Sequence, residues 1–309
     1  MRRKHVSVSR RVPDDGIGRR ADSVISISSH GYEVRVDPVH GGRIVSATYL
    51  GLDVLRPQTG GSNASALESA CFPLVPFSNR IRNGTFEYAG QQYHLAENWD
   101  GDAHVIHGEG WQRPWNVTAT DAAYAGLALH GSAWWPWRYD CYQDIAVGEH
   151  GIGLSLRLRN TDTVPVPAGL GFHPYFPRTP RTRLQFDARA AWPPMGSDDE
   201  GVLALDPANG FGAMRPVSDV VLDHCYEGWD GTARIIQPDS GLEVTVAALT
   251  GASHCVVYTP ADAPYFCFEP VSHRTGAFEA ASPEDAGLRQ LEPGETLELA
   301  IVIAAQVSN

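Results

Sequence analysis

Hydrophobic and polar residues alternate along much of the chain, in short segments separated by turn-forming residues. Tyr32, Val34 and Val36 alternate with charged residues, and a Gly-Gly turn then leads into residues 43–50. A period of two places successive side chains on opposite faces of a strand. The same period predicts further strands at residues 154–158, 243–247, 255–258 and 297–307.

A hairpin is predicted around Ala89-Gly90-Gln91. Phe86 and Tyr88 precede these residues, and Tyr93 and Leu95 follow them. Two short alternating segments joined by a few residues that include glycine are typical of a β-hairpin. This segment is therefore expected to form two antiparallel strands.

The even spread of strand segments predicts one large domain. Residues 64–69 are the one helical candidate, and no linker-like run interrupts residues 24–309. The 31 glycines and 22 prolines are typical of many turns between short strands. We therefore predict an all-β fold, a large antiparallel β-sandwich, over residues 23–309. Residues 1–22 are basic and poor in apolar residues, which predicts a disordered tail without a secretion signal.

Charge and composition narrow the range of partners. The formal net charge of −12 argues against nucleic acid, because phosphate backbones bind basic surfaces. No apolar run approaches the roughly 18 residues that a membrane span needs. The five cysteines are widely and irregularly spaced, which favours reduced thiols and a cytoplasmic protein.

His173 lies in the segment from Gly171 to Phe176 and carries the first candidate chemistry. Pro174 restricts the residue before it to an extended conformation, and Phe172 and Tyr175 place aromatic rings nearby. An imidazole that a restricted backbone holds in one orientation beside apolar rings is suited to act as a general acid. A hydrogen-bonded core histidine is the alternative reading of this motif alone.

Two other segments carry candidate substrate ligands. Arg80 and Arg82 occupy alternate positions of a segment expected to be extended, where either could bind substrate oxygens or remain solvated. His104 and His107 are three residues apart, a spacing that puts them on opposite faces of a strand. A shared zinc ion is therefore not expected, and His107 before a glycine is better read as a substrate ligand.

Two carboxylates complete the candidate set. Asp223 lies near Trp229, and a carboxylate beside an aromatic ring is typical of sugar binding. Glu269 lies at the end of an aromatic strand segment that is expected to be buried, where an unpaired carboxylate is costly. Glu269 and His173, drawn from different strands, could transfer protons in both directions.

With these residues, the chain resembles a known family, the aldose 1-epimerases or mutarotases. The resemblance covers most of the chain from about Gly31 onward. The motifs that carry it are, in order, Asn79-Arg80-Ile81 before Gly84-Thr85-Phe86, Ile106-His107-Gly108, His173-Pro174-Tyr175-Phe176, Leu222-Asp223 and Glu269-Pro270.

The resemblance implies a galactose-mutarotase-like β-supersandwich and the interconversion of α and β anomers of a free aldose. Glu269 resembles the catalytic base of the family and His173 its catalytic acid. His107, Arg80 and Asp223 resemble its ligands for the monosaccharide substrate. No cofactor and no metal are implied.

Three other functions stay open at this stage. The segment after Glu269, Pro270-Val271-Ser272-His273, departs from the galactose mutarotases, which leaves the preferred sugar open. A non-catalytic sugar-binding or sugar-sensing protein would keep the cleft without turnover. A hexose-6-phosphate mutarotase would need a basic phosphate site, and a glycosidase could pair Asp223 with Glu269.

Overall fold

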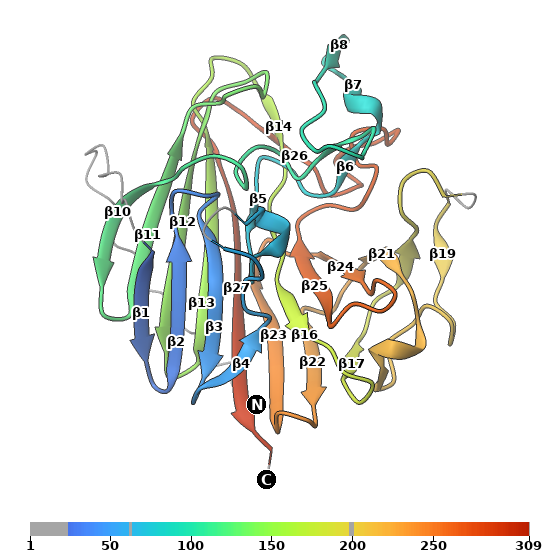
Figure 1. Ribbon diagram of the computed structural model, residues 1–309. Helices are drawn as coiled ribbons and strands as arrows, with labels where there is room; N and C mark the ends of the chain where they lie inside the picture. The colour runs from blue at the N-terminus through green and yellow to red at the C-terminus, as the bar shows by residue number, and fades with distance from the viewer. Residues whose placement is uncertain (1–23, 62–63, 198–200, 309) are drawn as a thin grey trace, which may run out of the picture.

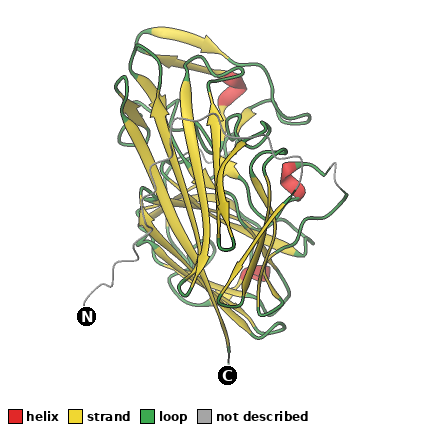
Figure 2. Cartoon of the chain, turned by 90° about the vertical axis from the view of Figure 1, so that its left-hand side faces the viewer, coloured by secondary structure: helices red, strands yellow, loops and turns green. Residues whose placement is uncertain are grey.

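The computed structural model describes residues 24–61, 64–197 and 201–308 of the 309-residue chain (Figure 1). The predicted tail at residues 1–22 lies outside the described residues. Strands dominate, and helix is limited in the described part to three short 3-10 turns (Figure 2). These turns are η1 (Ala66–Glu68), η2 (Arg82–Gly84) and η3 (Val217–Asp219). Within the same ranges no helix reaches the length and hydrophobicity that a membrane crossing requires.

A nine-stranded antiparallel sheet forms one layer of the molecule. It is built from segments of period two, in which alternate side chains are buried as expected for strands. In spatial order its strands are β10 (Asn116–Asp121), β11 (Tyr124–His130), β12 (Tyr139–Gly148), β13 (Gly151–Asn160), β27 (Thr296–Val307), β23 (Leu242–Thr250), β22 (Thr232–Gln237), β17 (Arg183–Phe186) and β20 (Arg215–Pro216).

Two smaller sheets cover this layer side by side, the first, drawn in blue, over its left half and the second to the right (Figure 1). The first has the order β1 (Ile25–Ser29), β2 (Tyr32–Asp37), β3 (Arg43–Tyr49) and β4 (Leu52–Leu55). The second has the order β19 (Leu203–Ala204), β18 (Ala190–Trp192), β21 (Asp223–Glu227), β24 (His254–Tyr258), β25 (Tyr265–Val271), β15 (Gly171–Phe172) and β5 (Pro73–Leu74), with β16 (Tyr175–Pro177) also paired to β25.

The main hydrophobic core lies between these layers. Phe186 of the nine-stranded sheet packs against Phe268 and Tyr226 of the eight-stranded sheet, with ring centroids 5.2 and 5.0 Å apart. The two covering sheets meet where the N–H of Arg56, just after β4, donates to the carbonyl of Tyr175 in β16 at 2.8 Å. In strand β25, Phe266 and Phe268 belong to this main core, whereas Cys267 between them lies in a second, smaller cluster. The two faces of β25 therefore contact different clusters.

Three two-stranded pairs complete the described structure. They are β6 (Arg80–Ile81) with β9 (Val105–Ile106), β7 (Thr85–Tyr88) with β8 (Gln91–His94), and β14 (Val166–Ala168) with β26 (Arg289–Leu291). The β7–β8 pair is the predicted hairpin. It projects beside the segment that carries β6 and β9 (Figure 1).

The sequence predictions for the fold are largely confirmed. The all-β antiparallel architecture and each alternating segment agree with the observed strands. The helical candidate at residues 64–69 is reduced to the single turn η1, which Ser65 caps at its N-terminus. The extended segment at Arg80 ends at Ile81, and Arg82 begins η2, so the two arginines do not share alternate positions of one strand.

Candidate active site

Glu269 is held on the outer face of β25, away from the main core. Phe266 and Phe268 alternate with it and fill that core, so the pleat of the strand directs Glu269 to the opposite side. Glu269 is paired with Val256 on β24 in the strand register. Its side chain is 3% exposed, so this carboxyl group is almost entirely removed from water.

His173 occupies the short connection between β15 and β16. Its backbone N–H donates to the carbonyl of Phe72 at 3.0 Å, and Pro174 follows it directly. Phe72 and Tyr175 both stack against the imidazole, with centroids 4.5 and 4.7 Å away. These two contacts restrict the orientation of the His173 ring.

These two side chains meet. Nε2 of His173 lies 3.3 Å from Oε1 of Glu269, and His173 is 6% exposed. Burial raises the pKa of Glu269 well above its usual value and lowers the pKa of His173 to about 3. Both shifts favour the uncharged forms, a protonated carboxyl beside a neutral imidazole.

His107 follows β9 in a left-handed conformation, with φ of 59°. Its N–H donates to the carbonyl of Asn79 at 2.8 Å, and its Nδ1 accepts from the N–H of Asn79 at 3.2 Å. Because Nδ1 is an acceptor, the proton of the neutral ring lies on Nε2. Gly108 has φ of 66°, and a Cβ there would lie 2.2 Å from the carbonyl oxygen of Val75. Glycine is therefore required at this turn.

The imidazoles of His107 and His173 lie together. Their centroids are 5.3 Å apart with the rings nearly perpendicular, at 86°. Burial, followed by the neighbouring His173 and Arg80, lowers the pKa of His107 well below its usual value. His107 is consequently neutral near pH 7 and presents one N–H donor.

Arg80 and Asp223 face each other next to these groups. Nη1 of Arg80 lies 3.4 Å from Oδ2 of Asp223, and Nε of Arg80 donates to Oδ2 of Asp102 at 2.9 Å. Burial raises the pKa of Asp223, and the Arg80 guanidinium opposes that shift. Both side chains are 28% exposed, so they can contact a ligand.

The five residues singled out in the sequence thus come together from five separate segments. Contacts join Glu269 to His173, His173 to His107, and Arg80 to Asp223, and Arg80 is paired in the strand register with Ile106, the residue before His107. Their chemical roles stay a prediction. Sequence reasoning missed Asp102 and Arg56, because no local pattern distinguishes them from surface polar residues, and it included Asn79 in a motif without its contact to His107.

His104 and His107 accept hydrogen bonds from different parts of the backbone. Nδ1 of His104 accepts from the N–H of Asn83, so the two rings serve different segments. Elsewhere in the described residues, donor atoms of His173, Cys267 and Glu269 lie within 4.8 Å of one another. Burial raises the pKa of the Cys267 thiol well above its usual value, which disfavours the thiolate that binds metal.

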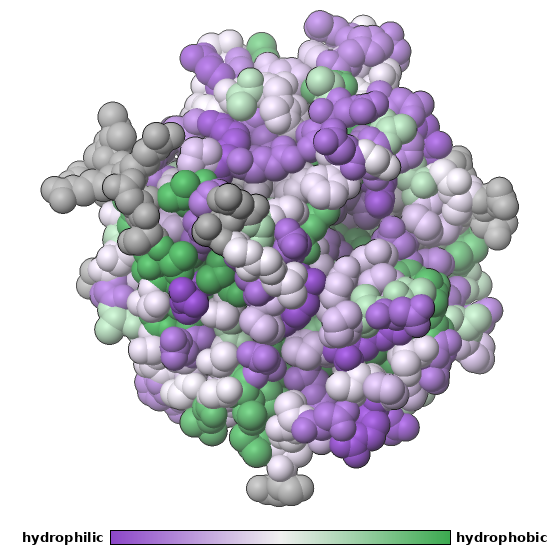
Figure 3. Space-filling model, viewed as in Figure 1, coloured by the Kyte–Doolittle hydropathy of each residue, from purple (hydrophilic) through white to green (hydrophobic). Residues whose placement is uncertain are grey.

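The molecular surface is hollowed over the region of β24 and β25 (Figure 3). Partly buried aromatic side chains pack beside the cluster that includes Phe72 and Cys267, among them Trp99, Tyr258 and Tyr265. Aromatic rings beside hydrogen-bonding groups can cover the apolar face of a sugar. The site can therefore bind a polyhydroxylated ring and transfer protons to and from it.

The sequence is similar to a known family and to a protein of Escherichia coli K12. A family model described as aldose 1-epimerase matches residues 23–304. YphB of Escherichia coli K12, an uncharacterised protein, is 31% identical over 257 residues, which cover 79% of this chain and 85% of YphB.

Solved structures give a similar result. A candidate aldose 1-epimerase from Escherichia coli K12 superposes with a TM-score of 0.83 at 26% identity, covering 92% of this chain and 99% of that chain. A galactose mutarotase-like protein from Clostridium acetobutylicum gives a TM-score of 0.76 at 16% identity, covering 92% and 95%. At this lower identity the likeness concerns the fold alone.

Proposed function

The chain belongs to the aldose 1-epimerase family, as its motifs predicted, and we propose that it interconverts the α and β anomers of a free aldose. One observation carries the proposal. Nε2 of His173 lies 3.3 Å from Oε1 of Glu269, and the two side chains form a buried acid–base pair. Groups able to bind sugar hydroxyls adjoin this pair.

Opening a cyclic hemiacetal requires two proton movements. The C1 hydroxyl loses its proton to Glu269, and the ring oxygen gains a proton from His173 as the bond between C1 and the ring oxygen breaks. Each such transfer contributes roughly 10²–10⁴-fold to the rate. After rotation about the bond between C1 and C2, the same two groups reverse their roles and the ring closes on the other face of C1.

The proton count of the pair supports this cycle. The reactive form, a Glu269 carboxylate beside a His173 imidazolium, carries the same number of protons as the neutral pair. Ring opening converts the ion pair into the neutral pair, which is the form that burial favours. Burial therefore drives both proton transfers in the direction of ring opening.

The neighbouring groups suit substrate binding. The Nε2–H of His107 can donate to a sugar oxygen, since Nδ1 is occupied by the Asn79 N–H. Arg80 offers donors and Asp223 offers acceptors, a combination that matches adjacent hydroxyl groups. The five cysteines are free and buried, which supports a reducing compartment, and we propose the cytoplasm.

The contact between Asp223 and Arg80 favours epimerisation over glycoside hydrolysis. A glycosidase would use two carboxyl groups around the scissile bond, and one of them would be Asp223. Asp223 is instead engaged by the Arg80 guanidinium at 3.4 Å, which suits a binding role. A sugar-binding protein without turnover would not need the buried pair of Glu269 and His173.

Polarimetry of freshly dissolved sugars tests the proposal. The protein is expected to accelerate the approach of α-D-glucose or α-D-galactose to anomeric equilibrium, with or without EDTA. It is also expected to leave nitrophenyl glycosides intact. Rates equal to those in buffer across a panel of hexoses and pentoses would reject the enzymatic function, and glycoside cleavage would favour the hydrolase.

A further inference from the structure

A guanidinium packs against the aromatic rings beside the acid–base pair. His173 stacks on Tyr175 with centroids 4.7 Å apart. The guanidinium carbon of Arg56 lies 4.1 Å from the centroid of Tyr175 and 4.5 Å from that of Tyr265. The rings of Tyr175 and Tyr265 contact each other edge to face, with centroids 5.2 Å apart. A permanent positive charge thus lies against the ring that stacks on the imidazole.

Arg56 is held in place without an acidic partner. It is 8% exposed, and its Nη2 donates to the carbonyls of Leu67 at 3.1 Å and Ser69 at 2.6 Å. Among the described residues no carboxylate forms an ion pair with it, whereas Arg80 contacts both Asp102 and Asp223. The charge of Arg56 therefore acts on its neighbours with little compensation.

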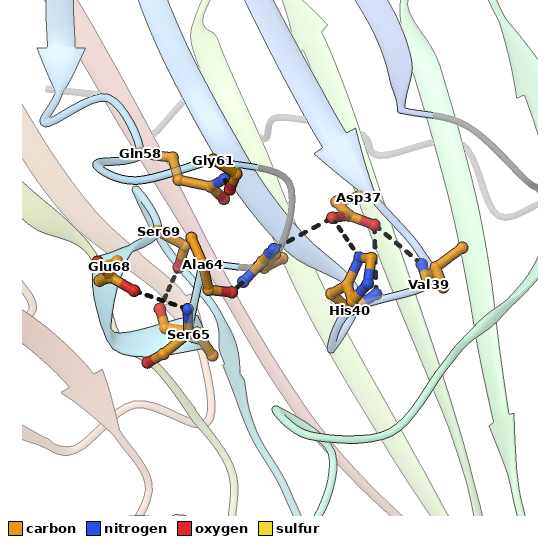
Figure 4. A network of polar contacts seen from close by, with 11 residues as sticks. Asp37, Val39, His40, Gln58, Gly61, Ala64, Ser65, Glu68 and Ser69 are labelled. Atoms are coloured by element: carbon orange, nitrogen blue, oxygen red, sulfur yellow. Dashed lines mark hydrogen bonds and ion pairs between the residues drawn. The ribbon is translucent and has the colours of Figure 1, made fainter.

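The acceptors of Arg56 belong to a rigid turn. Ser65 and Glu68 form a reciprocal cap of η1: the Ser65 hydroxyl accepts from the Leu67 N–H, and the Glu68 carboxylate accepts from the Ser65 N–H. The Ser69 hydroxyl donates to the carbonyl of Ala66 at 2.5 Å. Figure 4 shows Ser65, Glu68 and Ser69 gathered in this turn. The position of the guanidinium is thereby fixed.

We propose that Arg56 is a positioning residue of the acid–base pair, whose charge against the Tyr175 ring disfavours the imidazolium of His173 and so makes His173 a stronger acid. The inference rests on the proposed function and deepens it. A ring oxygen is a weak base, so its protonation needs a strong acid. An aromatic ring attracts a cation, and the Arg56 guanidinium already lies over the Tyr175 ring.

The other groups around His173 do not supply this effect alone. Glu269 on β25 and the neutral His107 face its ring, and the buried thiols of Cys71 and Cys267 lie close to the pair. Burial is the main cause that lowers the pKa of His173, and the charges of Arg56 and then Arg80 add to it. Since two carboxylates balance Arg80, Arg56 contributes the uncompensated charge.

Two substitutions of Arg56 test the proposal, because they separate the charge of the side chain from its shape. Arg56→Met removes the charge and keeps an extended side chain, while Arg56→Lys keeps the charge and loses the planar fork. Arg56→Met is expected to move both limbs of the pH profile of kcat/KM upward by about one pH unit. Arg56→Lys is expected to keep the wild-type profile, even where its melting temperature falls. An unmoved profile in Arg56→Met, or equal shifts in both variants, would overturn the proposal.

A second measurement does not depend on turnover. The pH at which the 15N chemical shift of His173 Nε2 titrates is expected to shift upward by about one pH unit in Arg56→Met and to stay unchanged in Arg56→Lys. Such a shift in a protein without epimerase activity would support the role of Arg56 and reject only the proposed function. If Arg56→Met does not fold, Arg56→Gln, which keeps an amide donor for Leu67 and Ser69, is judged by the same outcomes.

Discussion

The backbone N–H of Asn79 donates to Nδ1 of His107 at 3.2 Å, and the N–H of His107 donates back to the Asn79 carbonyl at 2.8 Å. Both residues have left-handed backbones, with φ of 58° and 59°. Two segments 28 residues apart are thereby locked together. The consequence is chemical, because the contact leaves Nε2–H of His107 as its free donor.

Substitution of His107 by the two amides tests this donor. The amide of His107→Gln reaches near Nε2 and can still donate, whereas the amide of His107→Asn lies near Nδ1 and cannot reach as far. We expect an intermediate loss of roughly 10- to 100-fold in kcat/KM for His107→Asn and a smaller loss for His107→Gln. Melting temperatures provide the control, because asparagine tolerates a left-handed backbone better than glutamine. A larger loss in His107→Gln at equal stability would contradict the assignment.

Arg80 and Asp223 are expected to act mainly on sugar binding. Hydroxyl contacts exist in both ground and transition states, so Arg80→Ala and Asp223→Asn should raise KM at least as much as they lower kcat. Asp102→Asn should produce a weaker change in the same direction, because Asp102 orients the Arg80 guanidinium. Asp100→Asn, at an exposed position in the same loop, is the matched control. A fall in kcat alone would place Arg80 in the chemical step.

The buried carboxylate of Glu109 is expected to control stability. It is 0% exposed and accepts from Arg113, from the hydroxyl of Tyr139 and from the N–H groups of Ala133 and Trp134. Glu109→Ala would leave buried donors and a partly buried cation unpaired, at a cost of roughly 3–5 kcal/mol in the free energy of unfolding.

Urea unfolding at constant pH measures this loss. Glu97→Ala, at an exposed position, is the control and should change the free energy of unfolding by less than about 0.5 kcal/mol. Equal stability of the two variants would show that the donors around Glu109 find other partners.

Local patterns could predict the strands and the hairpin, because a period of two and a glycine turn act within a few residues. The site residues could be predicted through short motifs in a fixed order. The partners Asp102, Asn79 and Arg56 could not. Asp102 meets Arg80 across 22 residues, and Asn79 meets His107 only because both adopt left-handed backbones. Such contacts depend on tertiary structure and leave no periodic signal.

The prediction that Arg82 points in the same direction as Arg80 is wrong for a related reason. Alternation with Arg80 predicted a common direction for both side chains, but the strand ends at Ile81. Asn83 takes a left-handed conformation, with φ of 50°, and turns the chain into the hairpin. Turn chemistry at a single residue therefore overrides the pattern of the preceding positions.

A buried histidine outside the site links stability to pH. Burial lowers the pKa of His254 to about 4, whereas the unfolded chain titrates near 6.5. A depressed folded-state pKa contributes stability that is present above about 6.5 and is lost as the pH falls toward 4. His254→Gln should therefore reduce the slope of unfolding free energy against pH by about 1.4 kcal/mol per unit in this window.

The exposed His150 provides the matched control for that slope. His150→Gln should leave it unchanged, because this side chain is exposed and the change removes no buried group. Urea midpoints at several pH values between 4 and 7.5 measure both variants. An unchanged slope in His254→Gln would mean that His254 becomes protonated in the folded protein at ordinary pH.

The last prediction separates the acid–base pair from the groups that bind the sugar. Glu269→Gln keeps the size of the side chain and removes its ability to accept a proton. His173→Asn likewise keeps a polar group beside Phe72 and Tyr175 and removes the titratable ring. Each change should lower kcat by at least about 10²-fold.

Sugar binding should survive both changes, because Arg80, Asp223 and His107 remain in place. Isothermal titration with the sugar should give a Kd within a few-fold of wild type, while polarimetry shows the loss of exchange. The double variant should be little slower than either single variant, because the two groups share one proton cycle and act as a unit. A kcat near the wild-type value in Glu269→Gln would remove the base from the mechanism. Independent, multiplicative losses in the double variant would show that Glu269 and His173 act in separate steps.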